Sequence, residues 1–210
     1  MKKLPFILLF LFGVLTSFAQ STIKVACVGN SITQGPGREH PDSFPLQMQV
    51  LLGDQYLVKN FGVSGRTLLK KGDFPYWNEP QFEEVKKFSP DILVIKLGTN
   101  DTKPQNWQYH AEFRQDFIDM IKTFRSDMPE NGQVYICLPA PIAENNFGIR
   151  EKIAVEEMRP ILLEVAKETG SKIIDLYSPL AEKRALLPDG VHPNKEGLGI
   201  MASEVAKAIK

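Results

Sequence analysis

The sequence has little of several features that mark particular classes of protein. Its 210 residues include two cysteines and three histidines, and its 25 basic side chains are balanced by 25 acidic ones. Without an excess of positive charge, nucleic acid is not expected to be the main partner. No His, Cys or Asp cluster has metal-ligand spacing, and glycine-rich phosphate motifs, repeats and low-complexity runs are missing. We therefore expect a globular domain that uses no metal or cofactor.

The first 19 residues differ from the rest. Lys2 and Lys3 precede the run Leu4 to Leu15, in which ten of twelve residues are apolar. Ser17-Phe18-Ala19 then places small residues at the −3 and −1 positions of a signal-peptidase site. An apolar run of about twelve residues is shorter than the roughly 20 that a membrane anchor requires. We expect a cleaved signal peptide and a protein that is periplasmic or secreted, without stable membrane association.

Removal of residues 1–19 changes the charge balance. Residues 20–210 contain 23 basic and 25 acidic side chains, a formal charge of −2. A chain of this length buries on the order of 70% of the surface that it exposes when unfolded. Residues 20–210 therefore suffice for one complete domain.

Short apolar runs alternate with amphipathic segments along this domain. Five runs of four to six residues are typical of strands buried on both faces: Ile23 to Val28, Tyr56 to Phe61, Ile92 to Leu97, Val134 to Leu138 and Ile173 to Leu176. Helical periodicity occurs over residues 113–124, 158–166 and 198–209. Gly170 suits the end of the second helix, and Pro160 marks its first turn or a kink. The alternation predicts an α/β fold with a parallel sheet and helices on both faces.

Short polar motifs follow four of the five predicted strands, at the edge where open parallel sheets carry their sites. These motifs are Gly29-Asn30-Ser31, Gly62-Val63-Ser64-Gly65, Gly98-Thr99-Asn100-Asp101 and, after a loop, Asp189-Gly190-Val191-His192. Each motif alone has an ordinary structural explanation as a helix cap or a turn. Their joint occurrence at strand ends favours a catalytic site.

The chemistry that these residues suit is nucleophilic catalysis. Ser31 lies just past a buried strand, and a serine nucleophile needs a base. His192 is the preferred base, because Asp189 lies three residues earlier in a turn and can orient the ring. The backbone N–H of Ser31, the N–H of Gly62 and the side-chain amide of Asn100 are candidate donors to an oxyanion.

The same motifs resemble the four sequence blocks of the SGNH/GDSL hydrolases, in order and with normal spacing, from Ile23 to the C-terminus. The resemblance implies a three-layer flavodoxin-like fold with strand order 2-1-3-4-5. It also implies a serine esterase in which Ser31 is the nucleophile, His192 the base and Asp189 its orienting acid, with an oxyanion hole from Ser31, Gly62 and Asn100. Asn30 departs from the Asp that many members carry at a non-catalytic position.

Longer strings around these blocks are similar to exported bacterial carbohydrate esterases that resemble sialate O-acetylesterases: residues 29–35, 97–107 and 189–194. The function this implies is hydrolysis of O-acetyl esters on carbohydrates. A lipase, lysophospholipase or thioesterase of the same family is the alternative, and a non-catalytic glycan-binding domain is a third. The sequence does not choose the glycan.

Several aromatic residues have two interpretations. His40, in the loop after Ser31, is a rim residue or a substrate contact, and Trp107 and Trp77 pack or stack on a sugar ring. His110 is interpreted as a surface or packing residue. Specificity is expected to lie in the loops at residues 35–42, 71–80 and 103–109.

The implied strand order also decides the state of the two cysteines. Cys27 lies on the first strand and Cys137 on the fourth, with the third strand between them. Two strand spacings are about 9.6 Å, whereas a disulfide needs Cα atoms within about 7 Å. We expect two buried free thiols.

The signal peptide is directly testable. When the full chain is expressed in a bacterium with a general secretory pathway, the mature protein should begin at Gln20, as read by N-terminal sequencing or intact mass. Because the −1 residue must be small, Ala19→Arg should block processing, whereas Gln20→Asn should not. A mature protein that still begins at Met1 would contradict the prediction.

Overall fold

The computed structural model describes residues 22–210. The predicted signal peptide lies outside the described residues. A five-stranded, wholly parallel sheet occupies the centre of the molecule, with the order β2-β1-β3-β4-β5. The predicted fold class and strand order are confirmed.

The five apolar runs form the five strands, and each boundary agrees with the prediction to within two residues. Their bounds are β1 Ile23–Gly29, β2 Tyr56–Gly62, β3 Ile92–Lys96, β4 Gln133–Cys137 and β5 Lys172–Ile174. The central strand β3 is buried along its whole length, which suits its four apolar residues and includes Lys96 at its end.

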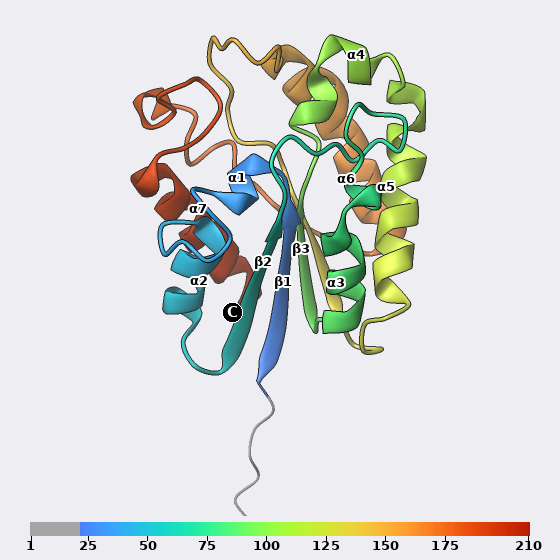
Figure 1. The fold of residues 1–210 in the computed structure, drawn as a ribbon, viewed down its shortest axis with the longest axis vertical. Coiled ribbons are helices and arrows are strands. Elements are labelled where there is room, and N and C mark those ends of the chain that lie inside the picture. Colours follow the sequence, from blue (N-terminus) through green and yellow to red (C-terminus); the bar gives the residue numbers. More distant parts are fainter. Residues whose placement is uncertain (1–21) are drawn as a thin grey trace, which may run out of the picture.

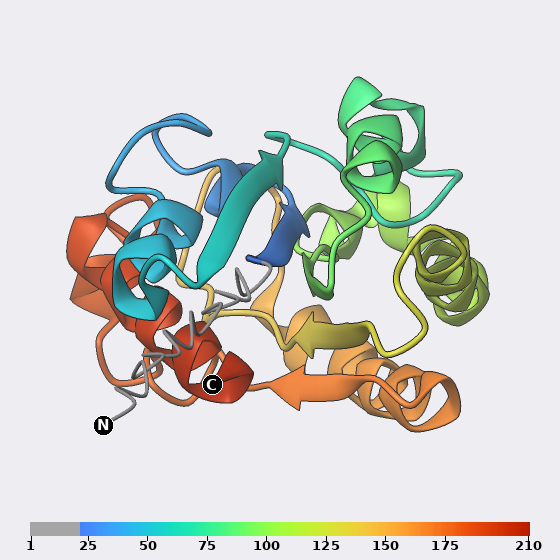
Figure 2. The same ribbon diagram turned by 90° about the horizontal axis from the view of Figure 1, so that it is seen from below.

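Helices cover both faces of the sheet (Figure 1). On one face lie α2 (Phe44–Leu52) and α7 (Lys195–Ile209), which bury their apolar stripes against one core cluster. The opposite face carries α3 (Pro80–Phe88), α5 (His110–Arg125) and α6 (Arg159–Thr169) over a second cluster. Figure 2, seen from below, shows the sheet between these two layers.

Two of these helices, α2 and α3, were not among the predicted elements. The first is apolar around much of its circumference, since Val50 and Leu51 are exposed although Phe44, Met48 and Leu52 are buried. This distribution hides the one-sided pattern on which the prediction of a helix depends. The second is short but one-sided, with Phe82 and Val85 buried, and the prediction overlooked it. Short segments complete the fold: α1 Ser31–Gln34, α4 Pro104–Trp107, and the 3₁₀ turns η1 Tyr76–Asn78, η2 Asn100–Thr102 and η4 Arg184–Leu186.

Pro160 and Gly170 mark the two ends of α6. Pro160 lies in its first turn, directly after the π-helical segment η3 (Ile153–Met158). Proline has no N–H to continue the preceding ladder, which accounts for the irregular turn there. Gly170 ends the helix in the left-handed conformation, with φ 62°, and donates its N–H to the Ala166 carbonyl.

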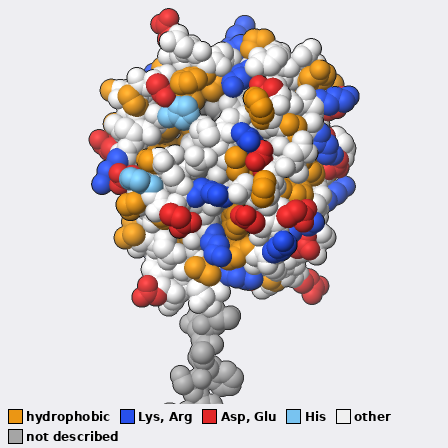
Figure 3. Space-filling view, viewed as in Figure 1, with side chains coloured by type: hydrophobic (Ala, Val, Ile, Leu, Met, Phe, Trp, Pro, Cys, Tyr) orange, Lys and Arg blue, Asp and Glu red, His pale blue; other side chains and the backbone are white. Residues whose placement is uncertain are grey.

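The surface carries no single-sign region on the face seen in Figure 3, where acidic and basic side chains are interspersed. Among residues 22–210, no helix has the length and hydropathy needed to cross a bilayer.

Cys27 and Cys137 are both free and buried, as predicted. Strand β3 separates them: Cys27 is level with Val94, which is level with Tyr135, two residues before Cys137. Burial raises the pKa of Cys137 to about 12. The thiol is therefore protonated at neutral pH and resists oxidation.

The mass of the denatured protein should consequently be unchanged by reduction. Intact mass spectrometry of protein purified without reductant, before and after treatment with a phosphine, tests this. A gain of two hydrogens would contradict both the thiol assignment and the separation of the two strands.

Candidate active site

The turn after β1 presents Ser31 at the carboxyl edge of the sheet. Ser31 is the first residue of α1, and Asn30 caps that helix by accepting the Ile32 N–H at 3.2 Å. A Cβ on Gly29 would lie 2.0 Å from Thr33 Oγ1 and 2.8 Å from the Lys96 carbonyl oxygen. Only glycine fits at position 29, and this close packing sets the position of the serine.

Ser31 is hydrogen-bonded to His192 and, through it, to Asp189. Ser31 Oγ lies 2.7 Å from His192 Nε2, and His192 Nδ1 lies 2.7 Å from Asp189 Oδ2. The carboxylate accepts at Nδ1–H, which leaves Nε2 to accept the serine hydroxyl. This is the arrangement that a serine nucleophile requires, assembled from residues 158 to 161 positions apart.

Backbone N–H groups orient the carboxylate of Asp189 for this contact. Its Oδ1 accepts the N–H groups of Val191 and His192 at 3.0 and 2.8 Å. Burial by itself raises the pKa of Asp189, but the hydrogen bonds from His192 and Val191 outweigh it and hold the pKa below its ordinary value. Asp189 is therefore ionised at neutral pH and stabilises a positive charge on His192.

The turn after β3 carries Asn100 beside the second motif. Asn100 Nδ2 donates to the Arg66 carbonyl at 3.0 Å, and the backbone carbonyl of Asn100 accepts from Asn106 Nδ2 at 2.9 Å. The second N–H of the Asn100 amide has no acceptor within residues 22–210. An amide held in this way can offer that N–H to a ligand.

Two buried ionisable side chains secure this turn. Asp101 accepts the backbone N–H groups of Leu68 and Leu69 at 3.0 and 2.8 Å, and burial raises its pKa to about 7. Lys96, 1% exposed, donates to Thr99 Oγ1 at 2.8 Å, and burial lowers its pKa to about 7. Desolvation penalises both charges, and these hydrogen bonds offset it while they tie the strand end to the turn.

Gly62 does not occupy the position expected of an oxyanion donor. Its N–H already donates to Asn60 Oδ1 at 2.9 Å. A Cβ there would lie 2.2 Å from the backbone nitrogen of Gln34, so Gly62 allows α1 to pack on β2. The expected role of Gly62 as a hydrogen-bond donor to substrate is thus contradicted by the geometry, because its hydrogen is used inside the protein.

Gly65, in the same motif, has the geometry that Gly62 lacks. It adopts φ 81°, and an added Cβ would meet nothing within 4 Å. Its neighbour Ser64 donates its N–H to Gln34 Oε1 at 2.8 Å, and Arg66 accepts from Asn100. The 64–66 segment therefore lies between α1 and Asn100, and the N–H of Gly65 has no acceptor in the described part of the chain.

Sequence reasoning also missed Asn60 and Asn106, which hold this arrangement together. Asn60 donates to the Thr33 carbonyl at 2.9 Å. Asn106 is fully buried and bonds both Asn100 and Asp73. The available signal was a polar side chain within an apolar strand for Asn60, whereas nothing local distinguishes Asn106.

A pocket of about 340 Å³ opens at Ser31 and His192. Ile32, Gly35, Pro36, Pro193 and Leu198 supply much of its apolar lining. Asp42 and Lys195, which form an ion pair at 3.0 Å, also line it. The pocket is compact and carries a charged pair in its wall.

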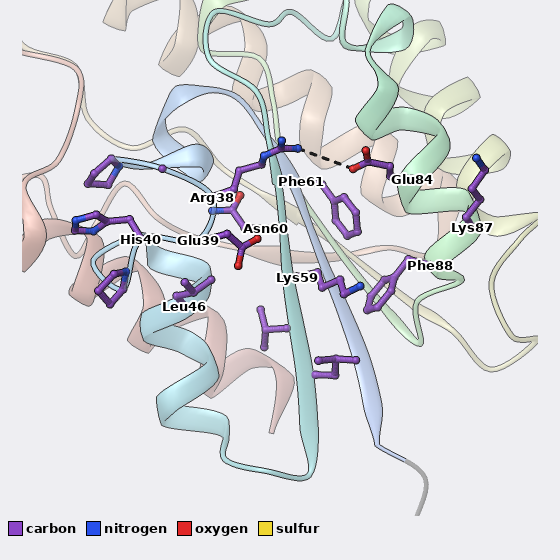
Figure 4. Close-up of a pocket in the computed structure, with 15 residues that line it drawn as sticks. Arg38, Glu39, His40, Leu46, Lys59, Asn60, Phe61, Glu84, Lys87 and Phe88 are labelled. Atoms are coloured by element: carbon purple, nitrogen blue, oxygen red, sulfur yellow. Dashed lines mark ion pairs between the residues drawn. The ribbon is translucent and has the colours of Figure 1, made fainter.

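A larger cleft, of about 1210 Å³, runs along the outer edge of β2 between the 36–41 loop and α3 (Figure 4). Arg38 reaches across it to Glu84, with 3.9 Å between Nη1 and Oε2. His40 lines this cleft and accepts the Asp42 N–H at 3.2 Å. Although Pro36 borders both cavities, His40 does not line the pocket at Ser31, so the rim interpretation fits it better than direct contact.

Trp107 is buried and Trp77 partly buried, whereas His110 lies at the surface. Trp107 is 5% exposed and donates its indole N–H to Glu157 Oε2 at 2.7 Å, which contradicts the interpretation that it stacks on a sugar. His110 stacks on Trp107 with ring centroids 5.9 Å apart. Trp77 donates to the Leu68 carbonyl and packs on Phe82. In the described part of the chain, no three His, Cys, Asp or Glu side chains gather as metal ligands.

Residues 27–199 match the model of the GDSL-like lipase/acylhydrolase family. The chain belongs to this family. It is 45% identical over 210 residues to an acetylxylan esterase of Xylanibacter ruminicola, a match that covers 91% of this chain and 44% of that protein. A multidomain esterase of Ruminococcus flavefaciens is 28% identical over 116 residues, or 54% of this chain and 15% of that protein. The chain thus spans less than half the length of these relatives.

A solved structure shares the fold. The carbohydrate acetylesterase family member from Sinorhizobium meliloti superimposes with a TM-score of 0.71 at 22% identity, covering 90% of this chain and 97% of that chain. The layered architecture therefore persists at low sequence identity within this group of proteins.

Asp101 should be important for stability. In Asp101→Asn, the new amide would turn an N–H toward one of the two backbone N–H groups, so we expect a loss of about 1–3 kcal/mol. Urea unfolding followed by circular dichroism measures it. Asp54→Asn, at an exposed turn, is the matched control, and equal stability of the two variants would contradict the anchoring role.

Proposed function

We propose that the chain is a serine esterase that removes acetyl groups from carbohydrate hydroxyls. The observation that carries the proposal is the hydrogen-bonded series Ser31, His192 and Asp189 at the mouth of a compact pocket. Membership of the acylhydrolase family and 45% identity to an acetylxylan esterase support it. Acetylated polysaccharides such as xylan are accordingly the substrate class that we favour.

The reaction begins with attack of Ser31 Oγ on the acetyl carbonyl carbon. His192 Nε2 takes the hydroxyl proton as the C–O bond forms, and Asp189 stabilises the resulting imidazolium. The tetrahedral intermediate then expels the sugar oxygen, which receives that proton from His192. Water, deprotonated by the same imidazole, hydrolyses the acetyl-serine and releases acetate.

Three N–H donors suit the oxyanion of the two tetrahedral intermediates. We assign the backbone N–H of Ser31, the side-chain N–H of Asn100 and the backbone N–H of Gly65, in place of Gly62. The assignment to Gly65 rests on its unused N–H and on the contacts that hold the 64–66 segment between α1 and Asn100. Such donors stabilise the transition state most when they are held in place before substrate binds.

A small acyl group fits the pocket better than a long one. A fatty acyl chain needs an extended apolar groove, whereas the wall at Ser31 contains the Asp42–Lys195 ion pair. A fatty acyl chain bound against this pair would remove water from both charges, which costs free energy. The lipase and thioesterase alternatives are therefore less consistent with the site, and we further propose that the enzyme acts after export, where polysaccharides are encountered.

Acetate release tests the proposed function. Wild-type protein should release acetate from acetylated xylan or acetylated sialic acid, and should hydrolyse p-nitrophenyl acetate faster than p-nitrophenyl octanoate. Ser31→Ala should reduce kcat by at least about 10⁴-fold with unchanged folding, because the nucleophile is lost. Faster octanoate hydrolysis would favour the lipase alternative, and full activity of Ser31→Ala would contradict the mechanism.

Asn100→Ala should lower kcat by roughly 10²–10³-fold, the usual cost of losing one oxyanion donor. Steady-state kinetics with p-nitrophenyl acetate measures the effect, with Asn131→Ala, in an exposed turn, as the control. If Asn100→Ala changes KM alone, Asn100 binds the ground state and is not an oxyanion donor.

A further inference from the structure

An exposed aromatic ring lies directly beside the proposed catalytic base. Phe147 is 46% exposed, and its ring meets that of His192 edge to face, with 5.4 Å between centroids and 84° between planes. A phenylalanine that served the core would be buried. Its exposure next to the proposed catalytic base leaves the ring free to contact a bound substrate.

The loop that carries Phe147 is built to hold it there. Asn145 makes four hydrogen bonds within the loop: its Nδ2 donates to the carbonyls of Ala143 and Ile149 at 2.9 and 3.0 Å, and its Oδ1 accepts the N–H groups of Phe147 and Ile149 at 3.0 and 3.3 Å. One side chain thus replaces the backbone pairing that a regular element would supply. These four hydrogen bonds fix the turn of the chain and therefore the position of Phe147.

The same loop docks on the turn that supplies the acid and the base. The N–H of Ala143 donates to the Gly190 carbonyl at 2.7 Å. Gly190 has φ 82°, and a Cβ there would lie 2.1 Å from the Glu144 carbonyl oxygen, so the contact is as close as a glycine permits. The loop of Phe147 and the turn of His192 are therefore fixed relative to each other.

A cavity of about 520 Å³ lies between this loop and residues 187–190. Phe147 and Pro188 give it apolar surface, and Asp189 borders it on the side of the proposed catalytic residues. Glu144 and Asn146 also line it, and their side chains form no hydrogen bond or ion pair with any residue from 22 to 210. An aromatic ring flanked by uncommitted carboxylate and amide groups matches a pyranose, which has an apolar C–H face and a rim of hydroxyls.

We propose that Phe147 and this cavity form a subsite for the sugar ring adjoining the acetylated unit of a polysaccharide. The inference rests on the proposed function and specifies its substrate as a chain of sugars. The acetylated ring reaches Ser31, the next ring stacks on Phe147, and its hydroxyls bond Glu144 and Asn146. Phe147 then determines specificity for linked over single sugars.

An exposed leucine on α6 provides a control. Leu163 is 47% exposed, close to the 46% of Phe147. It lines neither the pocket at Ser31 nor the 520 Å³ cavity, so Leu163→Ala removes exposed apolar surface without touching either one.

The test compares three substrates: p-nitrophenyl acetate, an acetylated methyl xyloside and a short acetylated xylo-oligosaccharide. Phe147→Ala should lower kcat/KM for the oligosaccharide about 3- to 10-fold, mainly through KM, because one stacking contact is lost. It should leave the two single-unit substrates within about twofold. Phe147→Trp should restore the oligosaccharide value, and Leu163→Ala should change none of the three.

Two results would overturn the subsite. An equal loss on all three substrates would mean that Phe147 only orients the His192 ring, and no loss on the oligosaccharide would mean that no sugar contacts it. Failure of the wild-type protein to release acetate from any sugar would instead contradict the proposed function. In that case, titration of Ser31→Ala with unacetylated xylo-oligosaccharide, followed by the NMR signals of the Phe147 ring, still decides whether the cavity binds sugar, since binding needs no turnover.

Discussion

All three central loops of the site leave the sheet at one level, because Gly29 of β1 pairs in register with Gly62 of β2 on one side and with Lys96 of β3 on the other. Parallel strands place the carboxyl ends of β1, β2 and β3 at the same edge. A shift of one residue in either pairing would turn every side chain of that strand to the opposite face. The two apolar layers make such a shift costly, so the packing of the core determines where Ser31, Gly65 and Asn100 stand.

Beyond the ends of the strands, buried polar side chains hold the loops of the site in position. Asp101 fastens the 66–69 segment to the turn after β3, and Asn60 fastens α1 to β2. Buried polar groups stabilise a structure only when they are hydrogen-bonded, so each of these contacts also excludes alternative arrangements. The loops of this edge are consequently rigid supports for the N–H groups and the imidazole.

Prediction from the sequence succeeded where one physical signal dominated. The strands were recognised because residues such as Val94 and Ile136 lie in unbroken apolar runs, and the Ser31, Asp189 and His192 geometry follows from motifs at strand ends. It failed where two signals compete or where nothing local marks a residue. Both Gly62 and Gly65 occur in one four-residue motif. The hydrogen bond to Asn60 and the close approach of Gln34 mark Gly62 as the packing glycine, and neither contact can be read from the motif. The sequence allowed Trp107 to stack on a sugar, but packing against α5 and η3 buries it.

Phe147 is a second residue that nothing in the local sequence marks as part of the site. The loop that carries it, residues 143–149, was not among those expected to shape specificity, because it contains no motif and lies far in sequence from every site residue. By itself the sequence indicated an α/β fold with a parallel sheet, since apolar period is a local property of the chain. The resemblance of its motifs to the SGNH/GDSL hydrolases implied the strand order and the candidate residues for acyl transfer. Only the tertiary structure decided which N–H groups remain unused, which aromatic rings reach solvent and which loop stands over His192. Those properties depend on contacts between residues that are far apart in the sequence, and such contacts cannot be read from the local sequence.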